Sequence, residues 1–332
     1  TLNSSLLGDL NYSYDALDRL TAEQKVNLQQ SYSYDAVGNR TGKTTTPIVN
    51  GVAQTSTQQT YQYASTSNRL TKIGTQAVTT DTVGNLTRDR TNRELVYDAQ
   101  NRLTSVKLGS NTVAEFRYNA LGQRTHKISA QGTTTFLYGP DGQLLGEQQF
   151  SSQGSKLSAQ YYIWLDSLPL GGVSITFDAQ GAIASSEPFY LHSDHLNTPR
   201  MATNQTQQNV WQWQSDAFGV GQATGSLAMN LRFPGQYFDQ ESGLHYNYFR
   251  DYDPETGRYV ESDTIGLAGG LNTYGYVGGN ALRYTDPTGE CGVVGGVIGG
   301  GVGLLAGVYL GTTNEIFTDP EGRNSIGNAF IN

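Results

Sequence analysis

The sequence predicts an all-β protein, and three observations support this fold class. The 332 residues include 40 Gly and 21 Tyr, while Asp, Glu, Lys and Arg together make up only 15%. Thr, Tyr, Val, Gly and Asn are typical of strands and turns, whereas helices favour Ala, Leu, Glu and Lys. A strand-and-turn phrase also recurs along the chain. The length allows one large core or two ordinary domains.

The recurring phrase is best represented by YDAVGNRT. Its strong and weak copies begin at Tyr14, Tyr34, Tyr63, Thr80, Tyr97, Tyr118 and Tyr138. A spacing of about twenty residues corresponds to one hairpin. Units of this kind bury a face only by stacking on their neighbours, so we expect one long sheet that curls.

The stretch SYSYDAVGNRT shows how each unit is built. Side chains alternate along a strand, so Tyr32 and Tyr34 are expected on one face and the serines on the other. The Asp35 side chain can cap the following turn. Gly38 or Asn39 can adopt the positive φ that such a turn requires, and the next strand begins directly afterwards.

Charge and cysteine content exclude several classes of protein. The net charge of −8 gives no general electrostatic reason to bind nucleic acid. The single cysteine, Cys291, excludes an intramolecular disulfide. The sequence starts at Thr1 within a repeat-like phrase, so we expect it to be the late portion of a longer chain.

Two other motifs have a chemical and a structural interpretation. HSDHLNTPR contains His192 and His195, but on a strand these histidines face opposite sides, and packing is favoured over a metal site. Trp211 and Trp213 share a strand face and could stack on sugars or bases. Cross-strand packing is the favoured role, because no basic residues are interleaved with them.

The repeats are followed by YLHSDHLNTPRMATNQTQQNVWQWQSDAFG and by LRFPGQYFDQESGLHYNYFRDYDPETGRYVESDTIGLAGGLNTYGYVGGNALRYTDPTGE. This order of motifs resembles the YD repeats and core region of Rhs proteins, over about residues 10–290. Rhs proteins are relatives of the C component of Tc toxins and, more distantly, of teneurins. The resemblance implies a β-strip that spirals into a hollow, cocoon-like shell, with the core curling inward as a plug. It implies a YD-repeat strip at 1–150, an Rhs core at 151–290 and the start of a toxin or cargo at 291–332.

Two aspartates are the main catalytic candidates. By themselves Asp263 in DTIGL and Asp286 in DPTG favour turns. The resemblance implies instead an aspartyl autoprotease with these two catalytic residues, which cuts between Glu290 and Cys291. Two adjacent carboxylates can share a proton, so that one activates water and the other acts as an acid. Such a site needs neither a metal nor a cofactor.

The sequence departs from the family pattern at two positions, one next to Asp263 and one next to the predicted cut. Thr264 stands where proline is usual, and Glu290 stands where leucine is usual. Arg258 precedes Asp263 by a few residues and could hold one carboxylate ionised, although a structural role after a glycine turn is slightly favoured.

The segment 292–310 contains no charged residue and has glycine at every fourth position. This spacing is typical of helices that pack closely in a bilayer, and the length is close to the roughly 20 residues that span one. Contact with a membrane and a flexible apolar linker both remain open for it.

The sequence therefore predicts part of an Rhs toxin shell that encloses its own C-terminal effector and frees it by autoproteolysis. The expected partners are this segment, a secretion-spike or Tc-type delivery partner and an immunity protein. The expected location is that of a secreted effector, delivered from the producing bacterium to a target cell. The alternative is a surface adhesin or carbohydrate-binding protein without self-cleavage. A conventional hydrolase is least favoured, because no Ser/His/Asp or metal motif is visible.

Overall fold

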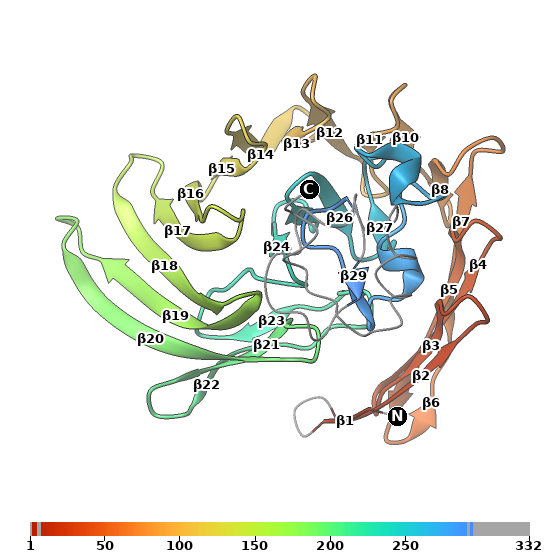
Figure 1. Ribbon diagram of the computed structural model, residues 1–332, viewed down its shortest axis with the longest axis horizontal. Coiled ribbons are helices and arrows are strands. Elements are labelled where there is room, and N and C mark those ends of the chain that lie inside the picture. The colour runs from red at the N-terminus through yellow and green to blue at the C-terminus, as the bar shows by residue number, and fades with distance from the viewer. Residues whose placement is uncertain (1, 5–7, 291–292, 295–332) are drawn as a thin grey trace, which may run out of the picture.

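The computed structural model describes residues 2–4, 8–290 and 293–294 of the chain. Regular structure in these ranges is almost entirely antiparallel β-sheet, which confirms the predicted fold class. Two large sheets follow one another along the chain and curl into an open arc around the later residues (Figure 1).

The first sheet consists of β1 (Leu2–Ser4), β2 (Gly8–Tyr14), β3 (Leu20–Gln24), β4 (Leu28–Tyr34), β5 (Arg40–Val49), β6 (Val52–Ala53), β7 (Thr57–Tyr63), β8 (Leu70–Ile73) and β9 (Gln76–Ala77). Its strands pair in chain order, except that β6 pairs with β5 alone and β7 follows β5 in the sheet.

The second sheet pairs fourteen strands in unbroken chain order. They are β10 (Thr79–Thr80), β11 (Leu86–Arg88), β12 (Arg93–Tyr97), β13 (Leu103–Leu108), β14 (Asn111–Tyr118), β15 (Arg124–Ser129), β16 (Gly132–Tyr138), β17 (Leu144–Phe150), β18 (Lys156–Leu165), β19 (Leu168–Phe177), β20 (Ile183–Ser193), β21 (Pro199–Asn204), β22 (Asn209–Trp213) and β23 (Ala223–Gly225). We call β1 to β22 the wall.

Residues 214–290, which we call the core segment, fold inside the arc (Figure 1). The segment contains a small sheet of β24 (Tyr237–Phe238), β25 (His245–Asn247), β26 (Arg250–Asp253) and β27 (Arg258–Tyr259). It also contains the short 3₁₀ turns η1 (Gly266–Gly269) and η2 (Val277–Gly279), and β28 (Tyr284–Thr285), which pairs with β29 (Val293–Val294).

The repeat turns have the predicted construction. Asp35 Oδ1 accepts hydrogen bonds from the backbone N–H groups of Val37 and Asn39, at 3.0 and 2.9 Å. Gly38 adopts φ +87°, a conformation that costs a glycine little because it has no Cβ. Tyr32 is buried in the largest apolar cluster and Tyr34 packs against the same cluster, which confirms that they share a face.

The repeat tyrosines also connect successive units. Their hydroxyls donate to backbone carbonyls one unit earlier: Tyr34 to Leu20, Tyr63 to Arg40, Tyr97 to Leu86 and Tyr118 to Leu103, at 2.8, 2.8, 3.0 and 2.6 Å. Each bond gives a partly buried phenol a backbone acceptor. The repeated Tyr-Asp pair therefore provides a bond between units and a turn within one.

Ion pairs with almost no solvent exposure join the wall to the core segment. Lys43 Nζ on β5 lies 3.2 Å from Asp216 Oδ2, and the two side chains are 7% and 3% exposed. On β15, Arg124 Nη2 donates to Asp239 Oδ1 at 3.2 Å. A buried ion pair specifies one arrangement, because an unpaired charge at the same place is strongly disfavoured.

The tryptophans have the structural role that the sequence favoured. Trp211 and Trp213 are 1% and 0% exposed, so neither presents a surface for stacking on a ligand. Their indole N–H groups donate to the carbonyls of Met229 and Gly221, at 3.2 and 2.9 Å. Both residues thus attach the end of the wall to the core segment.

Candidate functional site

The two predicted aspartates meet at Arg250, on a strand of the core segment's small sheet. Asp263 lies in the turn after β27, where its Oδ1 accepts the backbone N–H of Ile265 at 3.0 Å. Asp286 follows β28 directly. They are 9% and 1% exposed, respectively. The structure therefore brings together two carboxyl groups whose motifs by themselves indicated only turns.

Arg250, on β26, lies between the two carboxylates. Its Nη2 atom is 2.9 Å from Asp263 Oδ2 and 3.5 Å from Asp286 Oδ2. The guanidinium carbon lies 3.7 Å from the centre of the Tyr259 ring, and Nη1 donates to Thr273 O at 3.2 Å. A cation in this position offsets the repulsion between two neighbouring carboxylates.

Asp286 is surrounded by hydrogen-bond donors. Its Oδ2 accepts the hydroxyl of Tyr259 at 2.8 Å, in addition to the contact with Arg250. Its Oδ1 accepts the backbone N–H groups of Gly289 and Glu290, at 2.9 and 3.1 Å. These contacts hold the Asp286 carboxyl group in one orientation. They also bind the loop that contains the predicted cut directly to one of the predicted catalytic residues.

Asp263 has a different environment. Burial raises the pKa of its carboxyl to about 6, against an opposing effect of Arg250, and the negative charges of Asp286 and Glu290 raise it further. Desolvation of this kind favours the neutral acid. Asp263 can therefore carry a proton at mildly acidic pH, which is what a general acid requires.

Gly269 leaves room for Asp263 and for the end of the predicted substrate. A Cβ atom at this position would collide with Asp263 Oδ2 and would lie 3.0 Å from the carbonyl oxygen of Glu290. The carboxyl group and the carbonyl of the predicted bond thus border the same small space. Cys291, on the other side of that bond, lies outside the described residues.

Arg258 has a structural role. Arg250, and not Arg258, is the arginine that contacts the two carboxylates. Arg258 Nη2 donates to Asn68 O at 2.6 Å, and its guanidinium lies over the rings of Tyr63 and Tyr274. It thereby attaches the core segment to β7 and its following turn. The sequence contained no signal that distinguishes Arg250 from Arg258, because both stand on short strands of the same sheet.

The histidines of HSDHLNTPR also have local partners. His192 Nε2 lies 3.0 Å from Thr203 Oγ1 on the neighbouring strand. His195 Nε2 lies 2.8 Å from Leu282 O in the core segment. These contacts agree with the structural role that the sequence favoured.

A second carboxyl pair lies on the other side of β26. The backbone N–H of Asp251 donates to Glu261 Oε2 at 2.8 Å, and both side chains are buried. Burial raises the pKa of Asp251 to about 7 and that of Glu261 well above its usual range. Neither the repeat phrases nor the core motifs indicated this pair.

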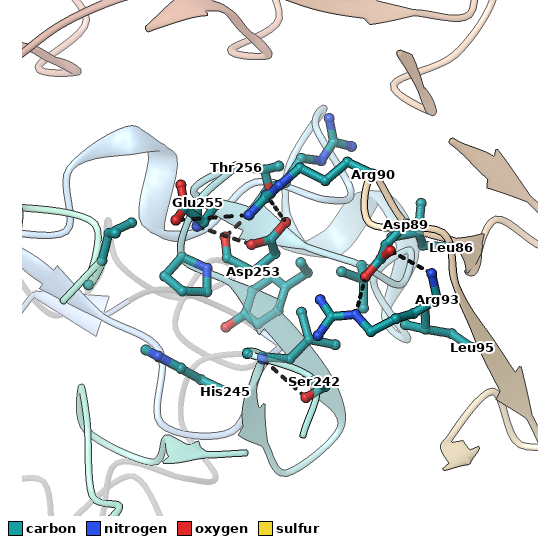
Figure 2. Close-up of a pocket in the computed structure, with 18 of the residues that line it drawn as sticks. Leu86, Asp89, Arg90, Arg93, Leu95, Ser242, His245, Asp253, Glu255 and Thr256 are labelled. Carbon is teal, nitrogen blue, oxygen red and sulfur yellow. Dashed lines mark hydrogen bonds and ion pairs between the residues drawn. The ribbon is translucent and has the colours of Figure 1, made fainter. Parts of the chain in front are cut away.

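A cavity of about 330 Å³ separates part of the wall from the core segment (Figure 2). Arg90 reaches across it, with its nitrogens 3.8 Å from Asp253 Oδ2 and 3.9 Å from Glu255 Oε1. Neither Asp263 nor Asp286 lines this cavity. This cavity is thus separate from the aspartate site.

Within the described ranges, no helix is long and apolar enough to cross a membrane. The segment 292–310, for which membrane contact was considered, lies almost wholly outside those ranges.

Comparisons with known proteins agree with the wall and core architecture. The family model described as teneurin YD-shell matches residues 8–271. Toxin protein Tse5 of Pseudomonas aeruginosa is 28% identical over 330 residues, covering 84% of this chain and 25% of that protein. Double-stranded DNA deaminase toxin A of Burkholderia cenocepacia is 29% identical over 239 residues, covering 59% of this chain and 17% of that protein.

A solved structure has the same fold. The Tc holotoxin pore of Photorhabdus luminescens aligns with a TM-score of 0.69 at 19% identity, covering 87% of this chain and 15% of its own. The chain spans a quarter or less of the length of these relatives. Because the family model covers most of the chain, the protein belongs to the teneurin YD-shell family, as an Rhs/YD-repeat protein related to the C component of Tc toxins.

Proposed function

We propose that this chain is the C-terminal part of an Rhs toxin shell that cuts its own backbone between Glu290 and Cys291. The supporting observation is the convergence of Asp263 and Asp286 on Arg250, beside the carbonyl of Glu290. The shell encloses the polypeptide that follows the cut. In this proposal residues 1–150 are the repeat strip, 151–290 are the Rhs core with its plug and 291–332 begin the effector.

The reaction consumes one water molecule. Asp286 accepts a proton from the water as its oxygen adds to the carbonyl carbon of Glu290. Asp263, in its protonated form, donates to the carbonyl oxygen. The bond from this carbon to the nitrogen of Cys291 then breaks: Asp286 passes its proton to that nitrogen, and the proton on the former carbonyl oxygen returns to Asp263 as the C=O bond forms again. The products are a new carboxyl end at Glu290 and a new amino end at Cys291.

Arg250 and the loop around Asp286 provide the positioning. The hydrogen bonds from the Gly289 and Glu290 N–H groups to Asp286 Oδ1 fix the backbone just before the cut. The β28–β29 pairing, with Thr285 opposite Val293, holds the chain on the far side of it. A substrate that is part of the same chain and fixed on both sides reacts without the entropy cost of a bimolecular encounter.

The names of the relatives support the biological context. Tse5 and the DNA deaminase are both described as toxins. In the proposal the chain acts as a secreted effector, delivered from a producing bacterium to a target cell. Its first partner is its own C-terminal segment, held non-covalently after the cut. A secretion-spike or Tc-type component delivers it, and an immunity protein protects the producing cell.

The test is to compare the parent chain with Asp263→Asn and Asp286→Asn. The parent is expected to give two fragments on a denaturing gel that co-elute under native conditions, whereas each variant gives one uncut chain. Asp253→Asn, beside the separate cavity, is the matched control and is expected to be cut like the parent. An intact parent, or two fragments from either variant of the pair, would contradict the proposal.

A further inference from the structure

The side chain of Glu290 has a specific neighbour. Thr264 Oγ1 donates to Glu290 Oε1 at 3.2 Å. Thr264 directly follows Asp263 in the chain, and Glu290 supplies the carbonyl of the bond that we propose is cut. Thr264, which is next to the proposed acid Asp263, therefore contacts the side chain of Glu290 on the amino side of the proposed cut.

The contact completes the fixation of residue 290. Its N–H donates to Asp286 Oδ1 at 3.1 Å, and its carbonyl oxygen lies in the space beside Gly269. Its side chain is held by Thr264. A residue fixed at its amide, its carbonyl and its side chain has little freedom to rotate the carbonyl away from the attacking water.

The Glu290 carboxylate accepts a hydrogen bond from a neutral hydroxyl, so this contact is not an ion pair. Among the ion pairs of the described residues none involves Glu290, although Arg250 lies nearby and bonds the adjacent Gly289 carbonyl. The hydroxyl of Thr264 is the side-chain donor to the Glu290 carboxylate there. Thr264 is exposed, so its hydroxyl favours glutamate only by the hydrogen bond that it donates, and an apolar side chain at position 290 would lose that bond.

We propose that Thr264 is a specificity-determining residue, which selects glutamate as the residue that precedes the cut. This inference rests on the proposed autoproteolysis. It explains in physical terms why the two positions that depart from the Rhs core pattern occur together. A proline at 264 has no hydroxyl to donate, and a leucine at 290 has no oxygen to accept. Either change alone would remove the hydrogen bond between the two side chains and leave one polar partner behind, whereas both changes together would leave an apolar pair.

A double-mutant cycle on the full chain tests the inference, with the rate of fragment formation measured by mass spectrometry after dilution from urea. Thr264→Val removes the hydroxyl and keeps the shape. It is expected to slow cutting roughly three- to tenfold when residue 290 is glutamate, the effect of losing one ordinary hydrogen bond at a solvent-exposed position. Thr264→Ser is expected to be cut at the parent rate, because it keeps the hydroxyl donor.

The same Thr264→Val change is then made in a Glu290→Leu chain. There it is expected to alter the rate by less than about twofold, because no acceptor remains, so that the two changes are not additive. Equal slowing in both backgrounds would overturn the role of Thr264 and leave the proposed function intact. Cutting of an Asp263→Asn chain would instead overturn the proposed function, and the inference with it.

Discussion

The rate of self-cutting should fall as the pH rises through the pKa of Asp263. That pKa is about 6, chiefly because the carboxyl is buried. Asp263 must be protonated to donate to the Glu290 carbonyl. The fraction of chains with a protonated Asp263 is about 0.9 at pH 5 and about 0.1 at pH 7. The expected rate therefore decreases about tenfold over these two pH units. An exposed aspartate, with a pKa near 3.9, would already be almost fully ionised at pH 5.

The assay uses chain that is kept uncut in urea and then diluted into buffers between pH 5 and pH 8. Fragment formation is followed on denaturing gels. Tryptophan fluorescence reports refolding in the same samples, since Trp211 and Trp213 become buried in the folded chain. Refolding must be faster than cutting at every pH for the profile to describe the chemical step.

Glu290→Gln tests the same assignment by shifting the pH–rate profile. The negative charge of Glu290 raises the pKa of Asp263, so its removal should move the midpoint to lower pH. The amide oxygen still accepts from Thr264, so the contact at the side chain is retained. A rate that is constant between pH 5 and pH 7, or that increases with pH, would refute the assignment of Asp263 as the acid.

Two further outcomes follow from the geometry. Lys43→Met should lower the free energy of unfolding by about 3–5 kcal/mol in urea titrations, because it leaves Asp216 charged and buried; adding Asp216→Asn should recover most of this loss. Recovery of none of it would contradict the role of the ion pair. Gly269→Ala should stop cutting with little change in the urea midpoint, because the added Cβ displaces the Asp263 carboxylate at an exposed turn. Ala268→Gly, one residue earlier, should be cut at the parent rate, and equal loss of cutting in both variants would contradict the steric argument.

The local structure of the repeats could be predicted from the sequence. Alternation placed Tyr32 and Tyr34 on one face, and turn chemistry predicted that Asp35 caps a turn with positive φ at Gly38. These features depend on residues a few positions apart, and short-range sterics and hydrogen bonding determine them. The all-β class followed from the same signals. Resemblance, rather than local pattern, pointed to Asp263 and Asp286.

Only the tertiary structure decided which residues surround those aspartates. Arg250 and Arg258 stand on neighbouring short strands, yet Arg250 lies between the carboxylates while Arg258 contacts Asn68. The contact between Thr264 and Glu290 likewise joins residues that are far apart in the chain. The sequence by itself determined the strands and the turns, and its resemblance to Rhs cores supplied the candidate pair of acids. The closure of the core segment against the curled wall determined which cation, hydroxyl and carbonyl meet them, because such contacts depend on the packing of the whole chain.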